Sequence, residues 1–280
     1  FIEVNLKSKR FLLLFFFTSL LFSQELNLLT YNIHGLNPII AGDDPYSRIP
    51  KILSKVTKYD IIFFQENWIY NNSSFASMLD SYNVFTTSDS KFFWPINKVF
   101  NPNGAGLSLA ISKSIDIIES SEHLFENCSG WLSKDNDCLA SKGFQYLRVQ
   151  INGHIFDLYN THFDAGQNDS DKNARLSQLN QLQKFIEVTS TDFPVIIAGD
   201  LNILYESSEY KIIDSFVIDN NLLEADWSSD LSKSKFGKLD YILYKSSKNT
   251  YINLEKCKVD INLSGLSDHP AIQAVFNLED

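Results

Sequence analysis

Two short runs of consecutive apolar residues most constrain how this 280-residue chain folds. They are D-I-I-F-F-Q (Asp60–Gln65) and F-P-V-I-I-A-G (Phe193–Gly199). Runs of this length without alternating polar positions are typical of strands that are buried on both faces, beneath covering helices. Covering helices are predicted at Ser47–Lys58 and Asp171–Thr189, where apolar residues recur at helical spacing. The alternation of these elements predicts an α/β sandwich.

Further strands complete this prediction. Asn152-Gly153 is a strong hairpin signal and predicts that Gly143–Ile151 and His154–His162 pair around it. One face of the longer helix should carry Leu176, Leu179, Leu182, Phe185 and Ile186. The other predicted strands are Leu26–Asn32, Gly106–Ser112 and its neighbour Ile115–Ser120, Leu239–Tyr244, Tyr251–Val259 and Ala271–Leu278. Since no repeat or linker interrupts them, residues 25–280 are expected to form one domain.

The N-terminal segment has the pattern of a secretory signal peptide. Lys7, Lys9 and Arg10 precede a twelve-residue apolar stretch, Phe11–Phe22. A helix needs about 20 residues to cross a bilayer core, whereas a basic flank and a short apolar stretch followed by polar residues are typical of a cleaved leader. We expect residues 1–24 to be this leader, with a buried first helix as the alternative. The mature protein should then be secreted or periplasmic.

The three cysteines agree with export. Cys128 and Cys138 are separated by nine residues rich in Gly, Ser, Asn and Asp, and in an oxidising compartment we expect a disulfide between them. Two unpaired thiols are the alternative, and the spacing does not match a zinc site. Cys257 remains and is expected to be buried.

The charge of the chain limits its partners. The formal net charge is −10, and removal of three basic residues and one acidic residue with the leader leaves 21 − 33 = −12. Proteins that hold nucleic acid by bulk electrostatics usually carry a basic patch, so the acidic balance argues against nucleic acid as a partner. A metal-dependent nuclease is not excluded, because a cation can offset phosphate charge locally.

Polar residues recur at the ends of the predicted strands. Any one of them has an ordinary explanation as a turn residue, but polar groups beside buried strands are costly unless they are paired or used. Sheet enzymes place their sites at strand ends. The residues are Asn32, Glu66, His162, Asp200, Asn202, Asp240, Asp268 and His269.

These residue types suit phosphate-ester hydrolysis. Glu66 and Asn32 offer oxygen ligands for Mg²⁺, or for another divalent cation such as Mn²⁺ or Co²⁺. His269, beside Asp268 and with Asp240 as a second orienting partner, is a candidate general base. Asn202 and His162 can donate to phosphoryl oxygens. The set favours in-line attack of water on a phosphate ester, with a metal stabilising the developing charge.

Six segments in this order resemble the endonuclease/exonuclease/phosphatase superfamily, from about Leu26 to the C-terminus. They are Y-N-I-H-G, Q-E-N, N-T-H-F-D, G-D-L-N, L-D-Y-I and S-D-H-P-A. The resemblance implies a four-layered α/β sandwich of two mixed sheets flanked by helices, with divalent-metal phosphoesterase activity. D-C-L-A-S-K-G-F (Asp137–Phe144) resembles bacterial sphingomyelinase C and related neutral sphingomyelinases, and implies a phospholipid substrate with peripheral membrane contact. We expect a monomer.

The resemblance also implies roles for individual residues. Glu66 and Asn32 would bind the metal, His162 and Asn202 would contact phosphate, and Asp200 would orient the attacking water. His269 would be the base, and Asp240 would support it. Asp268 would either join a second metal site or assist His269. Lys142 would approach the lipid phosphate, with a solvated loop lysine as the alternative.

One feature of the haemolytic members is missing. They carry an aromatic-tipped hairpin between L-D-Y-I and S-D-H, whereas Lys245–Ser267 contains only Tyr251 as an aromatic residue. Phe92-Phe93-Trp94 and Trp131 are candidate substitutes, with partly buried loop aromatics as the alternative interpretation. Trp68 is a candidate to hold a quaternary ammonium by a cation–π contact.

Three other functions remain open at this point. A secreted deoxyribonuclease-like endonuclease shares the catalytic residues but should carry a basic run beside the site, which Arg48, Lys142 and Arg175 do not form. A sugar-phosphate or inositol-phosphate phosphatase is a further alternative. A non-catalytic toxin or adhesion subunit on the same fold is disfavoured by the complete set of catalytic residue types.

Overall fold

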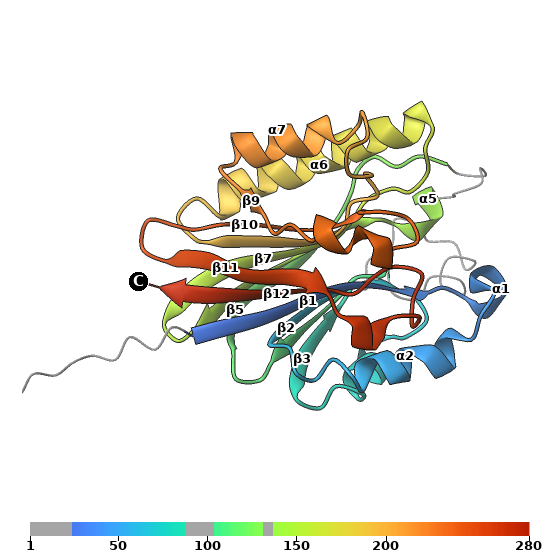
Figure 1. Cartoon of the computed structure of the whole chain (residues 1–280), viewed down its shortest axis with the longest axis horizontal. Coiled ribbons are helices and arrows are strands. Elements are labelled where there is room, and N and C mark those ends of the chain that lie inside the picture. Colours follow the sequence, from blue (N-terminus) through green and yellow to red (C-terminus); the bar gives the residue numbers. More distant parts are fainter. Residues whose placement is uncertain (1–23, 88–103, 131–136, 280) are drawn as a thin grey trace, which may run out of the picture.

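The computed structural model describes residues 24–87, 104–130 and 137–279 (Figure 1). The leader predicted at residues 1–24 lies outside this part except for its last residue, as do Phe92-Phe93-Trp94 and Trp131. The strands are β1 Gln24–Gly35, β2 Ile61–Asn67, β3 Tyr82–Thr86, β4 Ser108–Ser112, β5 Asp116–Leu124, β6 Gly143–Ile151, β7 His154–His162, β8 Val195–Asp200, β9 Leu223–Glu224, β10 Asp240–Lys245, β11 Tyr251–Val259 and β12 Ile272–Glu279. The helices are α1 Pro38–Ala41, α2 Pro45–Leu53, α3 Asn72–Ala76, α5 Asp137–Ala140, α6 Asp169–Thr189 and α7 Lys211–Asp219, with 3₁₀ turns η1 Ser228–Lys233 and η2 Ile261–Leu263.

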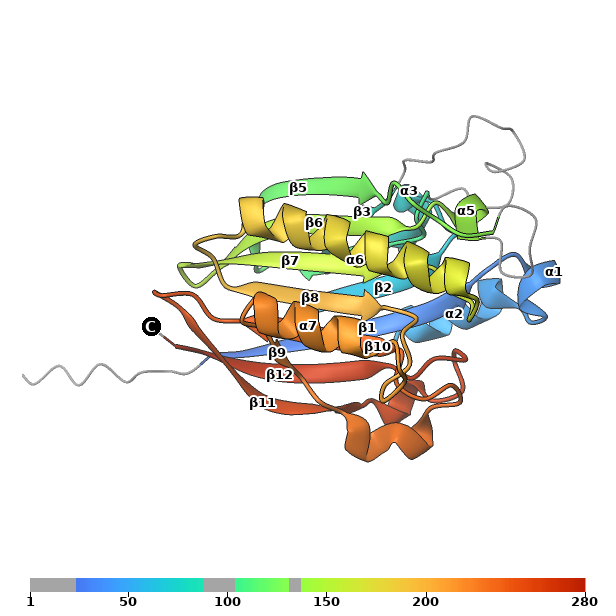
Figure 2. The same cartoon turned by 90° about the horizontal axis from the view of Figure 1, so that it is seen from above.

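The strands form two mixed six-stranded sheets, which confirms the predicted fold class. The first has the order β11-β12-β1-β2-β4-β3 and the second β5-β6-β7-β8-β10-β9. Each has one parallel pair at its centre, β1 with β2 and β7 with β8, between antiparallel neighbours. The carboxyl ends of these four central strands point toward the same end of the molecule (Figure 2). Side chains that follow them are therefore brought together.

Three hydrophobic clusters explain the layers. One fills the space between the sheets and includes Phe63, Leu158 and Ile196. A second packs α6 and α7 on the outer face of the β7–β8 sheet, and a third packs α2 on the outer face of the β1–β2 sheet (Figure 1). Because both faces of each sheet are covered, the central strands are apolar on both sides.

Three details differ from the sequence predictions. β4 and β5, predicted as neighbours, belong to different sheets, because β4 pairs with β2 and β3 whereas β5 pairs with β6. The helix predicted at Ser47–Lys58 is α2, which ends at Leu53, and Val56 still reaches the core from the turn that follows. In α6, Leu176 is exposed rather than packed.

The predicted disulfide joins Cys128 and Cys138. The bridge ties the chain that follows β5 to the start of α5. Cys257 is a free thiol that is only half-buried, and its Sγ donates to the carbonyl of Ala225 at 3.4 Å.

Candidate active site

Strand ends from both sheets supply the candidate site. Asn32 is on β1 and Glu66 on β2, whereas His162 ends β7 and Asp200 ends β8. The register places His162 opposite Asp200. Asp240 begins β10 and lies opposite Asp200 on its other side.

Buried polar side chains link the two sheets directly beneath this end. Asn160 on β7 donates from Nδ2 to the carbonyls of Phe64 and Ser108 in the other sheet, at 3.0 and 3.2 Å. Its Oδ1 accepts from Gln65 Nε2 at 2.8 Å. Because Asn160 and Gln65 are fully buried, these bonds are shielded from water and fix the alignment of the sheets below the site.

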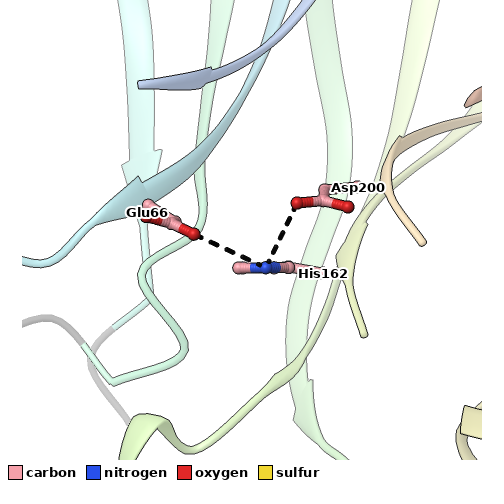
Figure 3. A group of neighbouring side chains, drawn as sticks. All are labelled: Glu66, His162 and Asp200. Atoms are coloured by element: carbon pink, nitrogen blue, oxygen red, sulfur yellow. Dashed lines mark ion pairs between the residues drawn. The ribbon is translucent and has the colours of Figure 1, made fainter. Parts of the chain in front are cut away.

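Two groups of potential ligand atoms meet at Asp200. Glu66, His162 and Asp200 form one group, and Asp200, Asp240 and His269 form the other; within each group the ligand atoms lie within 4.8 Å of one another. His162 Nε2 is 3.8 Å from Glu66 Oε1 and 3.5 Å from Asp200 Oδ2 (Figure 3). Carboxylates and imidazoles at this separation are typical donors to a divalent cation.

Glu66 also has a buried oxygen that makes no hydrogen bond. Its Oε1 accepts a hydrogen bond from Asn32 Nδ2 at 3.0 Å, whereas its buried Oε2 has no hydrogen bond among the described residues and lies 3.5 Å from Nδ1 of His34 as an ion pair. A buried carboxylate oxygen without a hydrogen bond is costly unless a nearby positive charge offsets it. The residues present therefore fit a divalent cation at Glu66.

Asn32 contacts the carboxylates through nitrogen. Its Nδ2 donates to Glu66 and, at 3.0 Å, to Asp200 Oδ2, while its Oδ1 accepts from the main-chain N–H of His34 at 3.0 Å. In this orientation Asn32 holds the two acids side by side. Direct ligation through its oxygen requires the amide to rotate.

His269 lies between two buried aspartates. Its Nδ1 is 2.9 Å from Asp240 Oδ2 and its Nε2 is 3.6 Å from Asp200 Oδ2. Burial opposes the charged imidazole, but the attraction of Asp240 and Asp200 outweighs it and raises the pKa of His269 well above its usual value. Burial also raises the pKa of Asp200, with His269 acting in the opposite direction.

Lys142 is buried rather than solvated. Its Nζ lies 2.6 Å from His162 Nε2 and 3.5 Å from Asp137 Oδ1, so the solvated-loop alternative is wrong. Burial and then Lys142 hold the pKa of His162 well below its ordinary value, which keeps this imidazole neutral. Burial raises the pKa of Asp137 to about 6 although Lys142 opposes the shift.

Asn202 is fixed by two bonds. Its main-chain N–H donates to Asp200 Oδ1 at 2.9 Å, and its Nδ2 donates to the carbonyl of Phe163 at 2.9 Å. Four non-glycine residues at this end have positive φ, a strained conformation that concentrates at functional sites. They are His34 (49°), Glu66 (61°), Ser141 (49°) and Asn202 (51°).

The structure contradicts the expectation for Trp68. The side chain is 3% exposed, and Lys142 Nζ lies 5.6 Å from the ring. The chain at Gly106 covers its indole so closely that an added Cβ there would lie 2.4 Å from Nε1. Trp68 therefore has no open face for a ligand ammonium.

His34 was missed from the sequence. It follows Asn32 by two residues, and its Nδ1 lies 3.5 Å from both Glu66 Oε2 and Asp268 Oδ2. Arg48 holds the same segment, because its guanidinium donates to the carbonyls of His34 and Ile33 at 2.8 and 2.6 Å. The histidine in Y-N-I-H-G was the available signal.

Comparisons with known proteins agree with this architecture. Residues 29–269 match the model of the Endonuclease/Exonuclease/phosphatase family. A putative neutral sphingomyelinase from Drosophila melanogaster is 28% identical over 197 residues, which are 68% of this chain and 42% of that protein. The chain thus spans less than half of that relative. Among the described residues, no helix is long and apolar enough to cross a membrane.

Solved structures share the fold. Sphingomyelinase C from Streptomyces griseocarneus superposes with a TM-score of 0.68 at 19% identity, over 90% of this chain and 99% of that one. A double mutant of Staphylococcus aureus beta toxin with bound magnesium ions also gives 0.68, at 20% identity over 90% and 99% of the two chains. With its two-sheet fold and the family match over most of its length, the chain belongs to the endonuclease/exonuclease/phosphatase family.

Proposed function

We propose that this protein is a divalent-metal phosphodiesterase that hydrolyses sphingomyelin to ceramide and phosphocholine. The observation that carries the proposal is the position of Asp200, which belongs both to a cation-binding group with Glu66 and to a proton-transfer group with His269 and Asp240. Phosphodiester hydrolysis requires both functions at one phosphorus atom. The similarity to the putative neutral sphingomyelinase of Drosophila melanogaster supports sphingomyelin as the substrate.

The metal would be held by Glu66, with Asp200 and Asp268 nearby and Mg²⁺ as the expected ion. Glu66 Oε2 is a buried oxygen that makes no hydrogen bond among the described residues and has only the ion pair with His34. When bound, the ion would offset phosphate charge and stabilise the charge that develops in the transition state.

The chain's own residues would then manage the proton and the phosphate. Asp240 accepts from Nδ1 of His269, which directs Nε2 toward Asp200. A water in contact with both His269 Nε2 and Asp200 Oδ2 would be oriented by the carboxylate and deprotonated by the imidazole. The two aspartates raise the pKa of His269, and a cation held by Glu66 would favour the neutral base form by adding positive charge near Asp200.

Phosphoryl oxygens would contact His162 and Lys142. The two side chains already share a short contact, and the Lys142 ammonium is the charged donor nearest to His162. Asn202 would contact phosphate through Nδ2 once its bond to the Phe163 carbonyl is released.

A lipid fits the charge distribution better than a nucleic acid. Arg175 is completely buried in an ion pair with Glu209, Lys142 is buried in the site, and Arg48 is bound to Asp43 and to main-chain carbonyls. None of these three side chains is free to hold a polyanion along several phosphates. Nucleic acid is therefore disfavoured.

Peripheral membrane contact would use α1. Ile39 and Ile40 are 92% and 61% exposed, and α1 lies at the end of the molecule toward which β1 runs, as the site does (Figure 1). The two isoleucines are consecutive and form a small exposed apolar patch, and such patches can serve as membrane contacts. Two isoleucines would bind a membrane only weakly. Since the aromatic hairpin of haemolytic members is also missing, activity on intact erythrocytes should be low.

Export of a monomer, as a mature domain of residues 25–280, is part of the proposal. The disulfide supports an oxidising compartment. N-terminal sequencing of protein recovered outside the cytoplasm should find a start near Gln24. A retained leader would contradict the predicted cleavage.

The test of substrate is a panel of sphingomyelin micelles, phosphatidylcholine micelles and plasmid DNA, at equal protein and Mg²⁺. We expect sphingomyelin hydrolysis at least about a hundredfold faster than plasmid nicking, because DNA binding needs several simultaneous phosphate contacts. His269→Ala is the control for contaminating activity and should lower kcat by about 10²–10⁴. Plasmid cleavage that equals sphingomyelin turnover would instead establish a deoxyribonuclease-like enzyme.

A further inference from the structure

An exposed aromatic ring lies beside the proposed catalytic histidine. The ring centre of Phe236 is 5.9 Å from that of His269, and the two ring planes are inclined at 53°. Phe236 is 42% exposed, so solvent reaches its ring, whereas Trp68 is buried beneath the chain at Gly106. Phe236 therefore offers an open aromatic surface next to the reacting groups, which Trp68 does not.

The segment that carries Phe236 is fixed on the C-terminal side of the ring. Ser234 Oγ donates to the carbonyl of Gly237 at 2.6 Å, and Gly237 adopts a φ of 80°, a conformation that glycine reaches without strain. The next residue, Lys238, is buried and forms two ion pairs. Asp240, two residues further on, holds the proposed catalytic imidazole. One short segment therefore positions both the aromatic ring and the imidazole before substrate binds.

The surroundings of the ring suit a methylated ammonium group. Lys235 Nζ lies 4.9 Å from the centre of the Phe236 ring, within the range of a cation–π contact, and this lysine is exposed and can move aside. Leu204 is also exposed and lies against the same turn, where a Cβ added to Gly237 would be 2.7 Å from Leu204 Cδ1. An aromatic face and an aliphatic side chain in one place suit a cation that carries methyl groups better than a small hydrated ion.

The direction of the reaction determines which part of a lipid can reach this ring. In the proposed function the attacking water contacts His269, and an in-line reaction expels the ceramide oxygen from the opposite side of phosphorus. The choline arm stays on the phosphate, to the side of the line between the attacking and leaving oxygens. Its ammonium is separated from phosphorus by only an ester oxygen and two carbons. It can therefore reach a ring beside the imidazole, whereas the ceramide is directed away from it.

We infer that Phe236 is a specificity-determining residue, which binds the quaternary ammonium of a phosphocholine head group against its ring. The ligand ammonium takes the place of the Lys235 ammonium on the ring. This inference rests on the proposed function, because it assigns a place to the head group of the lipid that the site would hydrolyse. A cation–π contact at an exposed ring is modest, so Phe236 tunes the preference for choline rather than deciding whether hydrolysis occurs.

The experiment compares two micellar lipids that have the same shape and differ in charge. One is sphingomyelin, and the other is its analogue with a carbon atom in place of the ammonium nitrogen, so that the head group ends in a neutral tert-butyl group. Phe236→Leu keeps an apolar side chain but removes the ring. We expect it to lower kcat/KM about three- to tenfold for sphingomyelin and less than about twofold for the neutral analogue. Phe236→Tyr keeps a ring and should retain the wild-type preference.

The comparison separates head-group binding from other effects. Because both lipids need the same chemistry, a disturbance of His269 would lower both rates together. Tyr251→Leu is the matched control and should change neither rate, since Tyr251 is exposed and pairs with Glu279 beside the start of β1, at the end of the sheet away from the site. An equal change for both lipids in Phe236→Leu, or no change for either, would overturn the inference and leave the proposed function intact. Absence of sphingomyelin hydrolysis by the wild type would overturn the proposed function, and the inference with it.

Discussion

Removal of the charge on Asp240 should disable the enzyme without unfolding it. Asp240 is completely buried, and its Oδ2 bonds to Nδ1 of His269 at 2.9 Å. Asp240→Asn keeps the shape of the side chain but removes its charge. Loss of one partner from a buried, hydrogen-bonded charge pair costs about 2–5 kcal/mol. At about 1.4 kcal/mol for each factor of ten, kcat should fall about 30- to 5,000-fold.

The assay measures kcat and kcat/KM for micellar sphingomyelin as a function of pH. Asp219→Asn, at an exposed position of α7, is the matched control. Attraction by Asp240 opposes burial and raises the pKa of His269. The acidic limb of kcat/KM should therefore move to lower pH in Asp240→Asn. A kcat within about threefold of the wild type (less than about 0.7 kcal/mol), together with an unmoved acidic limb, would refute the role of Asp240.

The same pair makes stability depend on pH. Because the pKa of His269 is raised in the folded state, its ion pair with Asp240 stabilises the folded protein. This contribution is fully present below the pKa of an unfolded histidine, about 6.5. It is lost as the pH rises through the raised folded-state pKa. In chelator, the difference in Tm between wild type and Asp240→Asn should therefore decrease as the pH rises.

Three other variants test the phosphate contact, the disulfide and the membrane contact. Lys142→Met should lower kcat by about a hundredfold, because a charge-assisted contact of about 3 kcal/mol to phosphate is lost. An unchanged circular dichroism spectrum would show that the variant is folded, and near-normal turnover would argue against the contact. Cys128→Ser should lower the free energy of unfolding by roughly 2.5–3 kcal/mol in a urea titration, and thiol titration of denatured wild type should find one free thiol, whereas three would exclude the bridge. The double variant Ile39→Asp/Ile40→Asp should bind sphingomyelin vesicles at least about tenfold more weakly in co-sedimentation, because its apolar contact surface is removed. Its kcat on micelles should be unchanged, because the catalytic residues are intact. Unaltered vesicle binding would place the membrane contact elsewhere.

Local patterns in the sequence were enough to predict most strands. D-I-I-F-F-Q becomes β2, and the Asn152-Gly153 turn joins β6 and β7 as expected. Apolar periodicity reports burial, but it does not say which sheet a strand joins. This is why β4 and β5 were wrongly paired: the chain leaves one sheet after Ser112 and enters the other at Asp116.

The site residues that the sequence did not predict correctly also depend on contacts between distant segments. Asn32, Glu66 and Asp200 stand at strand ends, where the sequence pattern marks polar groups beside buried strands. His34 resembles an ordinary turn residue until the loop that carries Asp268 is brought beside it. Trp68 was misinterpreted because its burial depends on the chain around Gly106, which lies far away in the sequence.

The placement of the site across the boundary between two sheets has a consequence for inactivation. Glu66 belongs to one sheet, and His162 and Asp200 belong to the other. A slide of one sheet against the other would therefore separate Glu66 from both partners while every strand kept its own hydrogen bonds. On gradual heating or in low urea, turnover should be lost before the circular dichroism signal of the strands changes. Substitutions at Asn160, which bonds across this boundary, should widen the interval between the two transitions.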